Sequence, residues 1–353
     1  MAITSIGLDI GSSAVRAVQV TAGSRGPATL DRLGQVVLPA GAVRDGEIVD
    51  PAPVTEALRT LWTRYGFKHR RVHMGVANQQ VVVRQMDLPY LPEEDLRQSL
   101  EFQAQDAIPI PVDQAILDHH TLEHYENDDG ERFSRILLVA AQRQMVESIL
   151  DAVNEAKLEP VGLDLDAFAM LRSLAPEGVL DDRDGELLID IGASVTNIVV
   201  HENGVPRFVR ILLMGGAGIT ETLMSGMQID YDAAEDLKAR TGLSDEYGFA
   251  DEDEGARLIT ERALRFVDEI RGSLDYYNAQ GDAVPVRRAV VSGGGSQLPN
   301  LRERLSETLR MPVERGHPMQ DLKIGNVGLA SEQLIEAEPY LAVAIGLALG
   351  AIR

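Results

Sequence analysis

A short pattern that occurs twice restricts the fold of this chain more than any other feature of its sequence. Residues 6–20 read IGLDIGSSAVRAVQV, and residues 187–200 read LLIDIGASVTNIVV. In each segment an apolar run that ends in Asp-Ile-Gly leads through a short polar turn into a second apolar run. Apolar and β-branched residues on both sides of such a turn are typical of a β-hairpin. The repeat therefore predicts a duplicated α/β fold with one hairpin in each half.

The turn of each hairpin carries groups that suit a phosphate. Gly11, Ser12 and Ser13 offer backbone N–H groups and two hydroxyls, and the carboxylate of Asp9 precedes them. A carboxylate beside clustered N–H donors is suited to a cation and a phosphate that lie between them. A single Gly-Ser-Ser hairpin is more often a plain turn. The second copy, at Asp190, predicts instead two turns that clamp one polyphosphate.

Composition limits the partners that the chain can bind. Its net charge of −22 over 353 residues repels nucleic acid and anionic lipid, so we expect no nucleic-acid partner and no polybasic membrane attachment. The absence of cysteine excludes disulfides, thiolate metal sites and a cysteine nucleophile. No signal-peptide pattern opens the chain, and the apolar run at 341–352 is too short to span a bilayer. We therefore expect a soluble, cytoplasmic protein.

Hydrophobic periodicity predicts similar elements after each hairpin. After the first hairpin we expect strands at 31–37, 72–77 and 160–165 and helices at 54–65 and 167–174. After the second we expect a strand at 207–213, helices at 219–227, 231–240 and 256–280, a strand at 288–292 and a closing helix at 339–350. The small residues of the closing helix suit tight packing between the halves.

Residues 80–157 differ in character and predict an inserted β-α-β-β-α subdomain. It contains His119, His120 and His124. Strand alternation places His119 and His120 on opposite faces, and no further ligand is suitably spaced. We interpret the three as exposed strand histidines and not as a metal site.

Further motifs after the second hairpin point to a ligand. Residues 292–296 read SGGGS and join a buried strand to a helix, where three adjacent glycines let a flat or phosphorylated group approach the backbone. The glycine cluster at 215–218 either serves the same purpose or is a simple strand-to-helix turn. Glu235 and Lys238 share one helix face, and the plain interpretation of that pair is a surface ion pair.

These motifs together resemble a known superfamily. The segments 9–13, 190–194, 292–296 and 342–350 resemble, in this order, the first phosphate, second phosphate, adenosine and second connecting motifs of the actin-like ATPases. Residues 83–96 (VRQMDLPYLPEEDL) and 101–111 (EFQAQDAIPIP), followed by Leu117-Asp118, resemble the insert of the type IV pilus assembly protein PilM family, which is related to the divisome protein FtsA.

The resemblance implies an α/β fold of the actin-like kind, a duplicated ribonuclease H-like fold in two halves with a small inserted α+β subdomain. The implied units are a first half at 1–79 and 158–183, the insert at 80–157, a second half at 184–220 and 285–353, and a helical nucleotide-side subdomain at 221–284.

The same resemblance implies ATP and Mg²⁺ bound between the halves. Asp9 and Asp190 would be the carboxylates on the magnesium side. Arg16 occupies a position where the family usually has lysine. The phosphates would lie against Gly11, Ser12, Ser13, Ala14, Arg16, Gly192, Ala193, Ser194 and Thr196, and the nucleoside against Glu235, Lys238, Gly294, Gly295 and Ser296.

Hydrolysis is expected to be slow at most. It would be a magnesium-assisted attack of water on the γ-phosphate, with Asp190 or Asp166 orienting that water. Ala193 replaces a glycine, and Asn197 an aspartate, that are common in vigorous ATPases of the superfamily. ATP would then serve mainly to fix the closure of the two halves.

The implied role is a cytoplasmic scaffold of the type IV pilus, or of a related secretion machine. The implied partner is the N-terminal segment of a PilN-like membrane protein, held by the first half and the insert at the cytoplasmic face of the inner membrane. No linker and amphipathic helix of the FtsA kind is visible, so we expect no direct membrane insertion. Alternatives are an FtsA-like filament-forming ATPase, which would self-associate with ATP, and a sugar kinase, for which no sugar-binding acid is evident.

Overall fold

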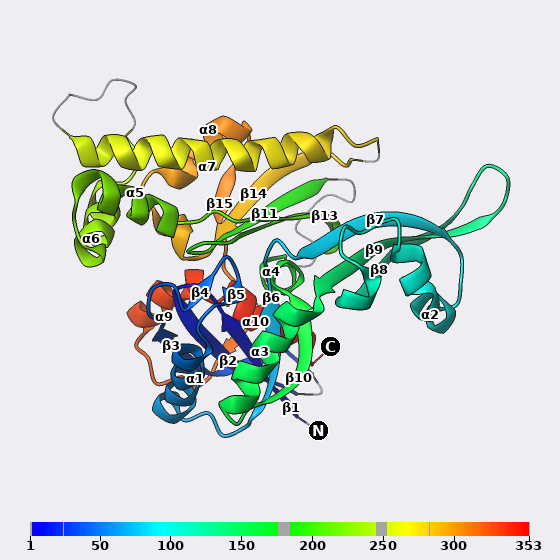
Figure 1. Ribbon diagram of the computed structural model, residues 1–353, viewed down its shortest axis with the longest axis horizontal. Helices are drawn as coiled ribbons and strands as arrows, with labels where there is room; N and C mark the ends of the chain where they lie inside the picture. The colour runs from blue at the N-terminus through cyan, green and yellow to red at the C-terminus, as the bar shows by residue number, and fades with distance from the viewer. Residues whose placement is uncertain (1, 24, 176–183, 245–252, 282, 353) are drawn as a thin grey trace.

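Two mixed sheets dominate the computed structural model of the chain (Figure 1), which describes residues 2–23, 25–175, 184–244, 253–281 and 283–352. The strands of the first sheet are β1 (Ile3–Ile10), β2 (Ala14–Ala22), β3 (Thr29–Val37), β6 (Arg71–Val76), β10 (Glu159–Leu165) and β16 (Lys323–Ile324). Those of the second are β11 (Gly185–Ile191), β12 (Thr196–Glu202), β13 (Val205–Leu212), β14 (Val286–Ser292) and β15 (Val313–Arg315). Their orders are β10-β6-β1-β2-β3-β16 and β13-β12-β11-β14-β15.

Each sheet is built around one of the two repeated segments. β1 and β2 form an antiparallel hairpin, and so do β11 and β12. A third antiparallel strand, β3 or β13, pairs on one side, and a parallel strand, β6 or β14, pairs on the other. The duplicated, actin-like α/β fold predicted from the sequence is therefore confirmed.

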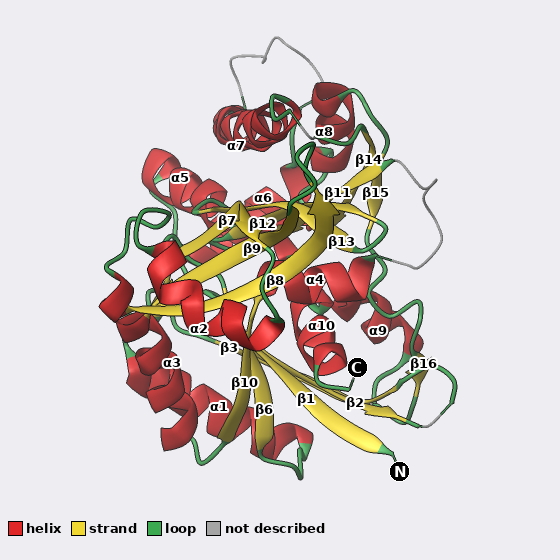
Figure 2. Ribbon diagram, turned by 90° about the vertical axis from the view of Figure 1, so that its right-hand side faces the viewer, coloured by secondary structure: helices red, strands yellow, loops and turns green. Residues whose placement is uncertain are grey.

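Helices cover both sheets and fill the space between them (Figure 2). The longer ones are α1 (Pro51–Tyr65), α3 (Arg143–Glu155), α4 (Asp166–Leu174), α5 (Ala217–Met227), α6 (Tyr231–Thr241), α7 (Glu254–Asn278), α8 (Leu301–Leu309) and α10 (Ala342–Gly350). The short ones are α9 (Ser331–Ala337) and the 3-10 turns η2 (Gly294–Gln297) and η3 (Glu338–Tyr340).

Helices α4 and α10 pack against each other between the sheets, with α10 on β1 and α4 on β11 and β12. Small residues make this contact close. A Cβ on Gly346 would lie 1.7 Å from the carbonyl oxygen of Ala169, and one on Gly7 would lie 2.0 Å from that of Ala344. The backbones of α4, α10 and β1 therefore touch without intervening side chains, which explains the small-residue composition of the closing helix.

The inserted subdomain projects to the right in Figure 1. It consists of β7 (Val81–Pro89), α2 (Glu93–Ala104), the 3-10 turn η1 (Val112–Gln114), β8 (Ala115–Glu126) and β9 (Arg132–Gln142). The strands pair in the order β7-β9-β8, and a separate core lies under α2, formed by residues that include Leu96, Leu100, Ile136 and Leu138.

Two of the expected boundaries between units are wrong. We expected α3 within the insert, but its apolar face, which includes Val146 and Ile149, joins the core of the first half and packs on α1 and β10. We also expected all of 285–353 in the second half, but β16 pairs with β3, and α10 packs on the first sheet. An amphipathic pattern indicates that a helix is packed, not which sheet it packs on. The expected end of the first half, at 176–183, lies outside the described residues.

A short hairpin escaped prediction because its segment looked like a plain Pro/Gly turn. It is formed by β4 (Val43–Arg44) and β5 (Glu47–Ile48), which pair antiparallel. Asp45 and Gly46 turn the chain with positive φ angles of 52° and 80°. A Cβ on Gly46 would lie 2.0 Å from the carbonyl oxygen of Ala77, so this hairpin is pressed against the end of β6.

Candidate functional site

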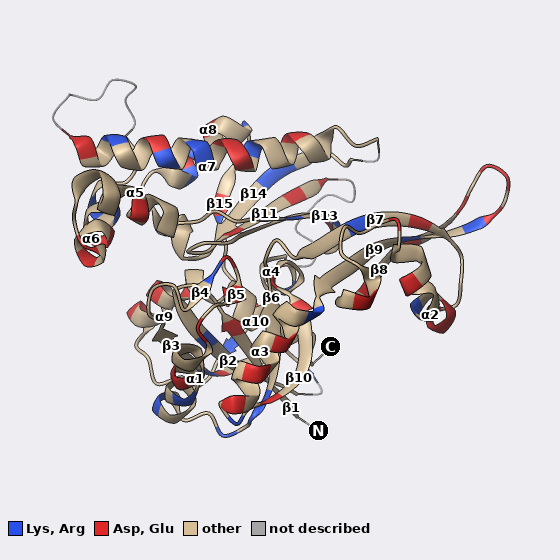
Figure 3. Ribbon diagram, in the orientation of Figure 1, with Lys and Arg blue, Asp and Glu red and all other residues tan. Residues whose placement is uncertain are grey.

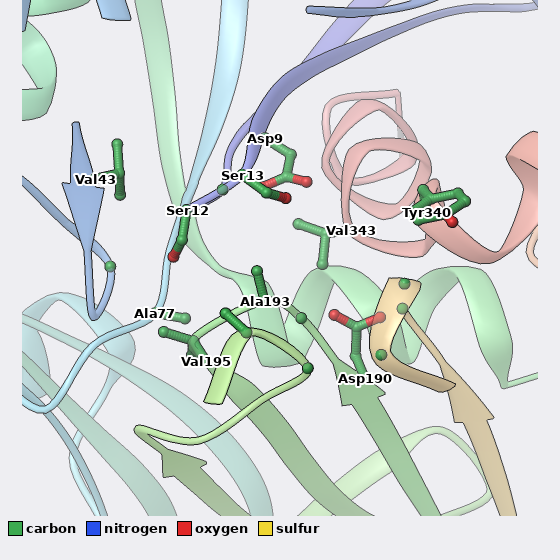
Figure 4. A pocket seen from close by; sticks show the side chains of 18 of the residues that line it. Asp9, Ser12, Ser13, Val43, Ala77, Asp190, Ala193, Val195, Tyr340 and Val343 are labelled. Atoms are coloured by element: carbon green, nitrogen blue, oxygen red, sulfur yellow. The ribbon is translucent and has the colours of Figure 1, made fainter. Parts of the chain in front are cut away.

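The two repeated hairpins point at each other across a cleft between the sheets (Figure 4). Their turns touch, because the hydroxyl of Ser12 contacts the hydroxyl of Ser194. The cleft has a volume of about 320 Å³ and is lined by both halves. Two of the positions predicted from the repeat, Asp9 and Asp190, both open onto it (Figure 4).

Asp9 is held by an arginine of its own hairpin. It stands opposite Arg16 in the β1–β2 register, and Nη1 of Arg16 lies 3.3 Å from Oδ2 of Asp9. Burial raises the pKa of Asp9, while the charge of Arg16 and its hydrogen bond act in the opposite direction. Arg16 also donates to Oε1 of Gln35 at 2.8 Å, and its Cζ lies 5.5 Å from the centre of the Tyr340 ring.

Two further buried carboxylates, Asp190 and Asp166, share the cleft. Burial, and then the charge of Asp9, raise the pKa of Asp190 to about 7, although Arg16 and a hydrogen bond from Ser292 favour its charged form. Burial, followed by the charges of Asp9 and Asp190, raises the pKa of Asp166 well above its usual range. Among the described residues that line the cleft, Arg16 supplies the single guanidinium near these carboxylates. Positive charge is therefore scarce around them.

This donor set suits a magnesium ion that arrives with a polyphosphate. Within the described part of the chain, no three histidine, cysteine or carboxylate side chains are placed to hold a metal by themselves. Mg²⁺ usually takes one or two carboxylates and completes its shell with water and phosphate oxygens. Asp9 and Asp190 line the cleft and would supply the carboxylates, and Oδ1 of Asp166 is buried without a hydrogen-bond partner.

Glycines form the wall where a nucleoside was expected. A Cβ on Gly293 would lie 2.3 Å from the carbonyl oxygen of Ile191, and one on Gly295 would lie 2.4 Å from Cγ2 of the same residue. Gly293 also has a φ of 83°, which glycine adopts readily. The backbone at 293–295 can therefore lie directly on β11, with its outer side open to the cleft.

Glu235 and Lys238 face the cleft from α6. Nζ of Lys238 lies 2.6 Å from Oε1 of Glu235, 2.7 Å from the hydroxyl of Thr220 and 3.3 Å from the carbonyl oxygen of Gly216. The side chain of Lys238 is 15% exposed. The pair is therefore not the surface ion pair of the plain interpretation, since it ties α6 to the start of α5 at the edge of the cleft.

The structure brings most of the predicted residues to the cleft. Those that line it are Asp9, Gly11, Ser12, Ser13, Arg16, Asp166, Asp190, Gly192, Ala193, Glu235, Lys238, Gly294 and Gly295. Ala14, Ser194, Thr196 and Ser296 are not among the lining residues. Ala14 is buried in the sheet, the hydroxyl of Thr196 donates to the carbonyl oxygen of Met214, and that of Ser296 donates to the carbonyl oxygen of Gly293.

Several lining residues were missed by sequence reasoning. Tyr340 reaches the cleft from η3, and Val43 reaches it from the β4–β5 hairpin (Figure 4). Gln297 and Leu298 follow the glycine run, and Tyr231 starts α6. Only Gln297 and Leu298 had a signal in the sequence, because they continue a motif already identified. The others belong to segments with no motif, and the fold alone places them at the cleft.

A second cavity, of about 680 Å³, lies where the insert meets the first half. Its walls include β8, the end of β10, α4 and the turn between β12 and β13. Apolar side chains predominate: Val76, Ile116, Val139, Ala141, Leu163, Leu165, Phe168, Leu171, Ala175, Val205 and Pro206. The charged groups include Asp118, Asp164 and Arg172, of which the last two form an ion pair.

His119 and His120 lie on different sides of β8, as alternation predicts, but the expectation that these histidines are exposed is wrong for His119, whose side chain is 1% exposed. The ring of His120 lies 5.9 Å from that of Phe168 beside the second cavity, whereas Nε2 of His119 lies 3.3 Å from Oε1 of Glu93 on α2. Burial, and then the neighbouring His119, lower the pKa of His120. His124 shares a 2.9 Å hydrogen bond with the hydroxyl of Ser134.

Charged residues are unevenly distributed over the molecule. Figure 3 shows acidic residues along α2 and on the loop between β8 and β9, and mixed charge along α7. Most ion pairs of α7 are exposed pairs one turn apart, such as that between Arg257 and Glu261. Pairs of this kind stabilise a helix only weakly and do not form a site.

Comparisons with known proteins place this geometry in a family. The chain is 25% identical to the cell division protein FtsA of Pseudomonas aeruginosa, over 89% of this chain and 82% of that protein. A solved PilM-PilN type IV pilus biogenesis complex matches with a TM-score of 0.85 and 28% identity, covering 99% of this chain and 98% of that one. MreB5 of Spiroplasma citri, solved with AMPPNP, shares the fold with a TM-score of 0.55 and 13% identity, covering 98% of this chain and 95% of that one.

None of the helices in the described part of the chain combines the length and the apolar character that crossing a membrane requires. The model of the family "Type IV pilus assembly protein PilM" matches residues 7–352, which is nearly the whole sequence. This chain therefore belongs to the PilM family of type IV pilus assembly proteins.

Proposed function

We propose that this chain binds ATP with Mg²⁺ in the cleft between its halves and holds the N-terminal segment of a PilN-like membrane protein in the second cavity. In this role it is a scaffold at the cytoplasmic face of the inner membrane, where its partner keeps it. The observation that carries the proposal is the pair of facing hairpin turns, with Asp9 and Asp190 beside them.

The chemistry of the cleft supports a nucleoside polyphosphate. The turns at 11–13 and 192–193 supply backbone N–H groups and hydroxyls, which are suited to phosphate oxygens. The glycine run at 293–295 and the α6 pair of Glu235 and Lys238 lie where a ribose and a base would extend. MreB5, which shares this fold, was solved with AMPPNP. Mg²⁺ would neutralise the phosphates and relieve the crowding of the carboxylates.

Catalysis is proposed to be slow. Asp166 is the carboxylate best placed to orient a water, because its Oδ1 is buried without a hydrogen-bond partner and the residue lines the cleft. It would hold that water by accepting a hydrogen bond and would take up a proton when the water attacks. Asn197, opposite Asp190 in the hairpin register, adds no further charge. The main use of ATP would then be to stabilise one arrangement of the two halves.

The second cavity supports an extended, largely apolar peptide. Its volume is larger than that of the cleft, and two strands that lie at the edges of their sheets, β8 and β10, border it. Edge strands offer free backbone groups, and alternating side chains of an added peptide would meet the apolar walls. Asp118 suits a basic group on the peptide, whereas Asp164 is already paired with Arg172. The solved relative is a complex of PilM with PilN.

Calorimetry on the full chain tests both parts of the proposal. The unmodified protein is titrated with Mg-ATP and, separately, with a synthetic peptide of the N-terminal segment of the PilN protein from the same organism. We expect one ATP and one peptide per chain. A protein that takes up no nucleotide would refute the proposed cleft ligand, and one that ignores the peptide would refute the proposed partner.

Substitution of Gly216 by valine is expected to block the nucleoside part of the cleft. Its backbone angles, φ −62° and ψ −29°, suit any residue. A Cβ there would lie 3.4 Å from the Cα of Gly295 and 3.9 Å from Nζ of Lys238, so a valine would fill the space between them. We expect affinity for Mg-ATP to fall roughly a hundredfold, measured by calorimetry, with little change in melting temperature.

Gly272→Val is the matched control for this substitution. Gly272 is exposed on α7, and no atom lies within 4 Å of the position that its Cβ would take. This variant should bind Mg-ATP like the unmodified protein. If Gly216→Val did so as well, the nucleoside would not lie between Gly216 and Gly295.

A further inference from the structure

The turn between β12 and β13 belongs to the second half, yet it forms one wall of the second cavity. Residues 203–206 line that cavity together with β8 of the insert and β10 of the first half. The strand that leaves the turn also reaches the insert, because Nη1 of Arg207 lies 3.9 Å from Oε1 of Glu123. The cavity is therefore lined by all three parts of the molecule, and this turn is the wall that the second half contributes.

The turn is a tight hairpin connection with positive φ angles at both of its central residues. Asn203 and Gly204 have φ angles of 49° and 83°, so both lie in the left-handed region of a tight two-residue hairpin. The N–H of Gly204 donates to Nδ1 of His201 at 3.2 Å. His201 follows a register shift in the β12–β13 pairing, and its hydrogen bond to Gly204 holds the tip of the hairpin.

His201 can accept this hydrogen bond because a buried carboxylate fixes its proton on the other nitrogen. Its side chain is 2% exposed, and Nε2 lies 2.8 Å from Oε2 of Glu186, which is 1% exposed. Nε of Arg288 lies 2.5 Å from the second oxygen of Glu186. With Nε2 donating to Glu186, Nδ1 carries no proton and accepts.

We infer that His201 is a positioning residue for partner binding: it holds the 203–206 turn, the wall that the second half contributes to the peptide cavity. The inference rests on the proposed function, since it takes the second cavity as the peptide site. It adds that the peptide contacts the second half as well as the first half and the insert. His201 does not touch the peptide, because it is buried behind the turn.

Two substitutions at His201 separate its two hydrogen bonds. His201→Gln carries its amide nitrogen near the place of Nε2 and keeps a donor for Glu186, but it has no acceptor at the place of Nδ1. His201→Asn carries its carbonyl oxygen near the place of Nδ1 and keeps an acceptor for the N–H of Gly204, but it does not reach Glu186. If His201 only stabilised the buried group that it forms with Glu186 and Arg288, the His201→Gln variant would be the better tolerated of the two, because it keeps the donor for Glu186.

The positioning role predicts the opposite order for peptide affinity. In calorimetry with the PilN peptide we expect His201→Gln to bind roughly tenfold more weakly and His201→Asn to bind like the unmodified protein. Affinity for Mg-ATP should be unchanged in both, because residues 203–206 do not line the cleft. Equal peptide affinity in the glutamine variant and the unmodified protein would overturn the inference.

Amide hydrogen exchange at Gly204 gives a readout that needs no peptide. Loss of the acceptor should speed exchange of the Gly204 N–H in His201→Gln and leave it protected in His201→Asn. If the unmodified protein bound no peptide while exchange followed this order, the turn would be held as described and the proposed partner would be wrong. If exchange did not differ between the variants, His201 would not hold the turn, whatever the peptide does.

Discussion

Replacement of Asp190 by asparagine is expected to stabilise the nucleotide-free protein at pH 8 and to abolish tight binding of Mg-ATP. Burial and the charge of Asp9 raise the pKa of Asp190 to about 7 in the folded protein, against an ordinary value of 3.8. Between these two pH values the folded state holds a proton that the unfolded state has lost. The contribution of Asp190 to stability therefore falls as the pH rises from about 4 to about 7 and stays low above that range.

Asparagine at position 190 carries no charge, so the variant does not lose stability in this way as the pH rises. At pH 8 we expect the free energy of unfolding to increase by an amount on the order of 4 kcal/mol, and at pH 4 we expect almost no difference. Thermal unfolding at the two pH values measures the effect. Asp106→Asn is the control, because Asp106 is exposed and should show no such dependence. A gain in melting temperature that is the same at both pH values would contradict the role given to the Asp190 charge.

The same substitution should weaken binding of Mg-ATP roughly a hundredfold, because the proposed site keeps only one of its two magnesium-side carboxylates. Stability and affinity then move in opposite directions, a combination that a merely misfolded variant cannot produce. Calorimetry with ATP in the presence and absence of Mg²⁺ separates the metal contribution from that of the nucleotide. If the loss were equal in both conditions, Asp190 would act on the nucleotide and not through the metal.

The sequence was informative where local chemistry and repetition act together. The two Asp-Ile-Gly segments form matching hairpins, and Asp9 and Asp190 face one cleft because the same topology repeats around each hairpin. Thr196 was expected at the phosphates on the same motif, but strand alternation turns its hydroxyl to the carbonyl oxygen of Met214. A motif shows which residues lie near a turn, whereas the alternation of side chains along the strand determines which of them face the ligand.

Tertiary packing decided the features that the sequence did not predict. The apolar face of α3 is clear from its sequence, but nothing in that pattern distinguishes the core of the insert from that of the first half. Tyr340 lines the cleft because the chain returns to the first sheet through η3 and α10. The second cavity has no motif at all, since its walls come from five separated segments.

Replacement of Leu163 by glutamate is expected to abolish binding of the PilN peptide and to leave binding of Mg-ATP intact. Leu163 lies on the edge strand β10, is 37% exposed, and lines the second cavity. A peptide that fills the cavity would cover a carboxylate at this position with apolar groups, next to Asp164. Burial of an unpaired charge is costly, so we expect a loss of roughly a hundredfold or more in peptide affinity.

Ile335→Glu is the matched control for Leu163→Glu, because it introduces the same charge at an exposed apolar residue. Ile335 is 66% exposed on α9, a helix next to η3 and far in the sequence from β10. It should bind peptide and Mg-ATP like the unmodified protein, so a loss confined to Leu163→Glu places the peptide in the second cavity. Since residue 163 is partly exposed before the peptide binds, the folded protein tolerates the charge and the cost arises only in the complex. Unchanged peptide affinity in Leu163→Glu would mean that the partner binds elsewhere.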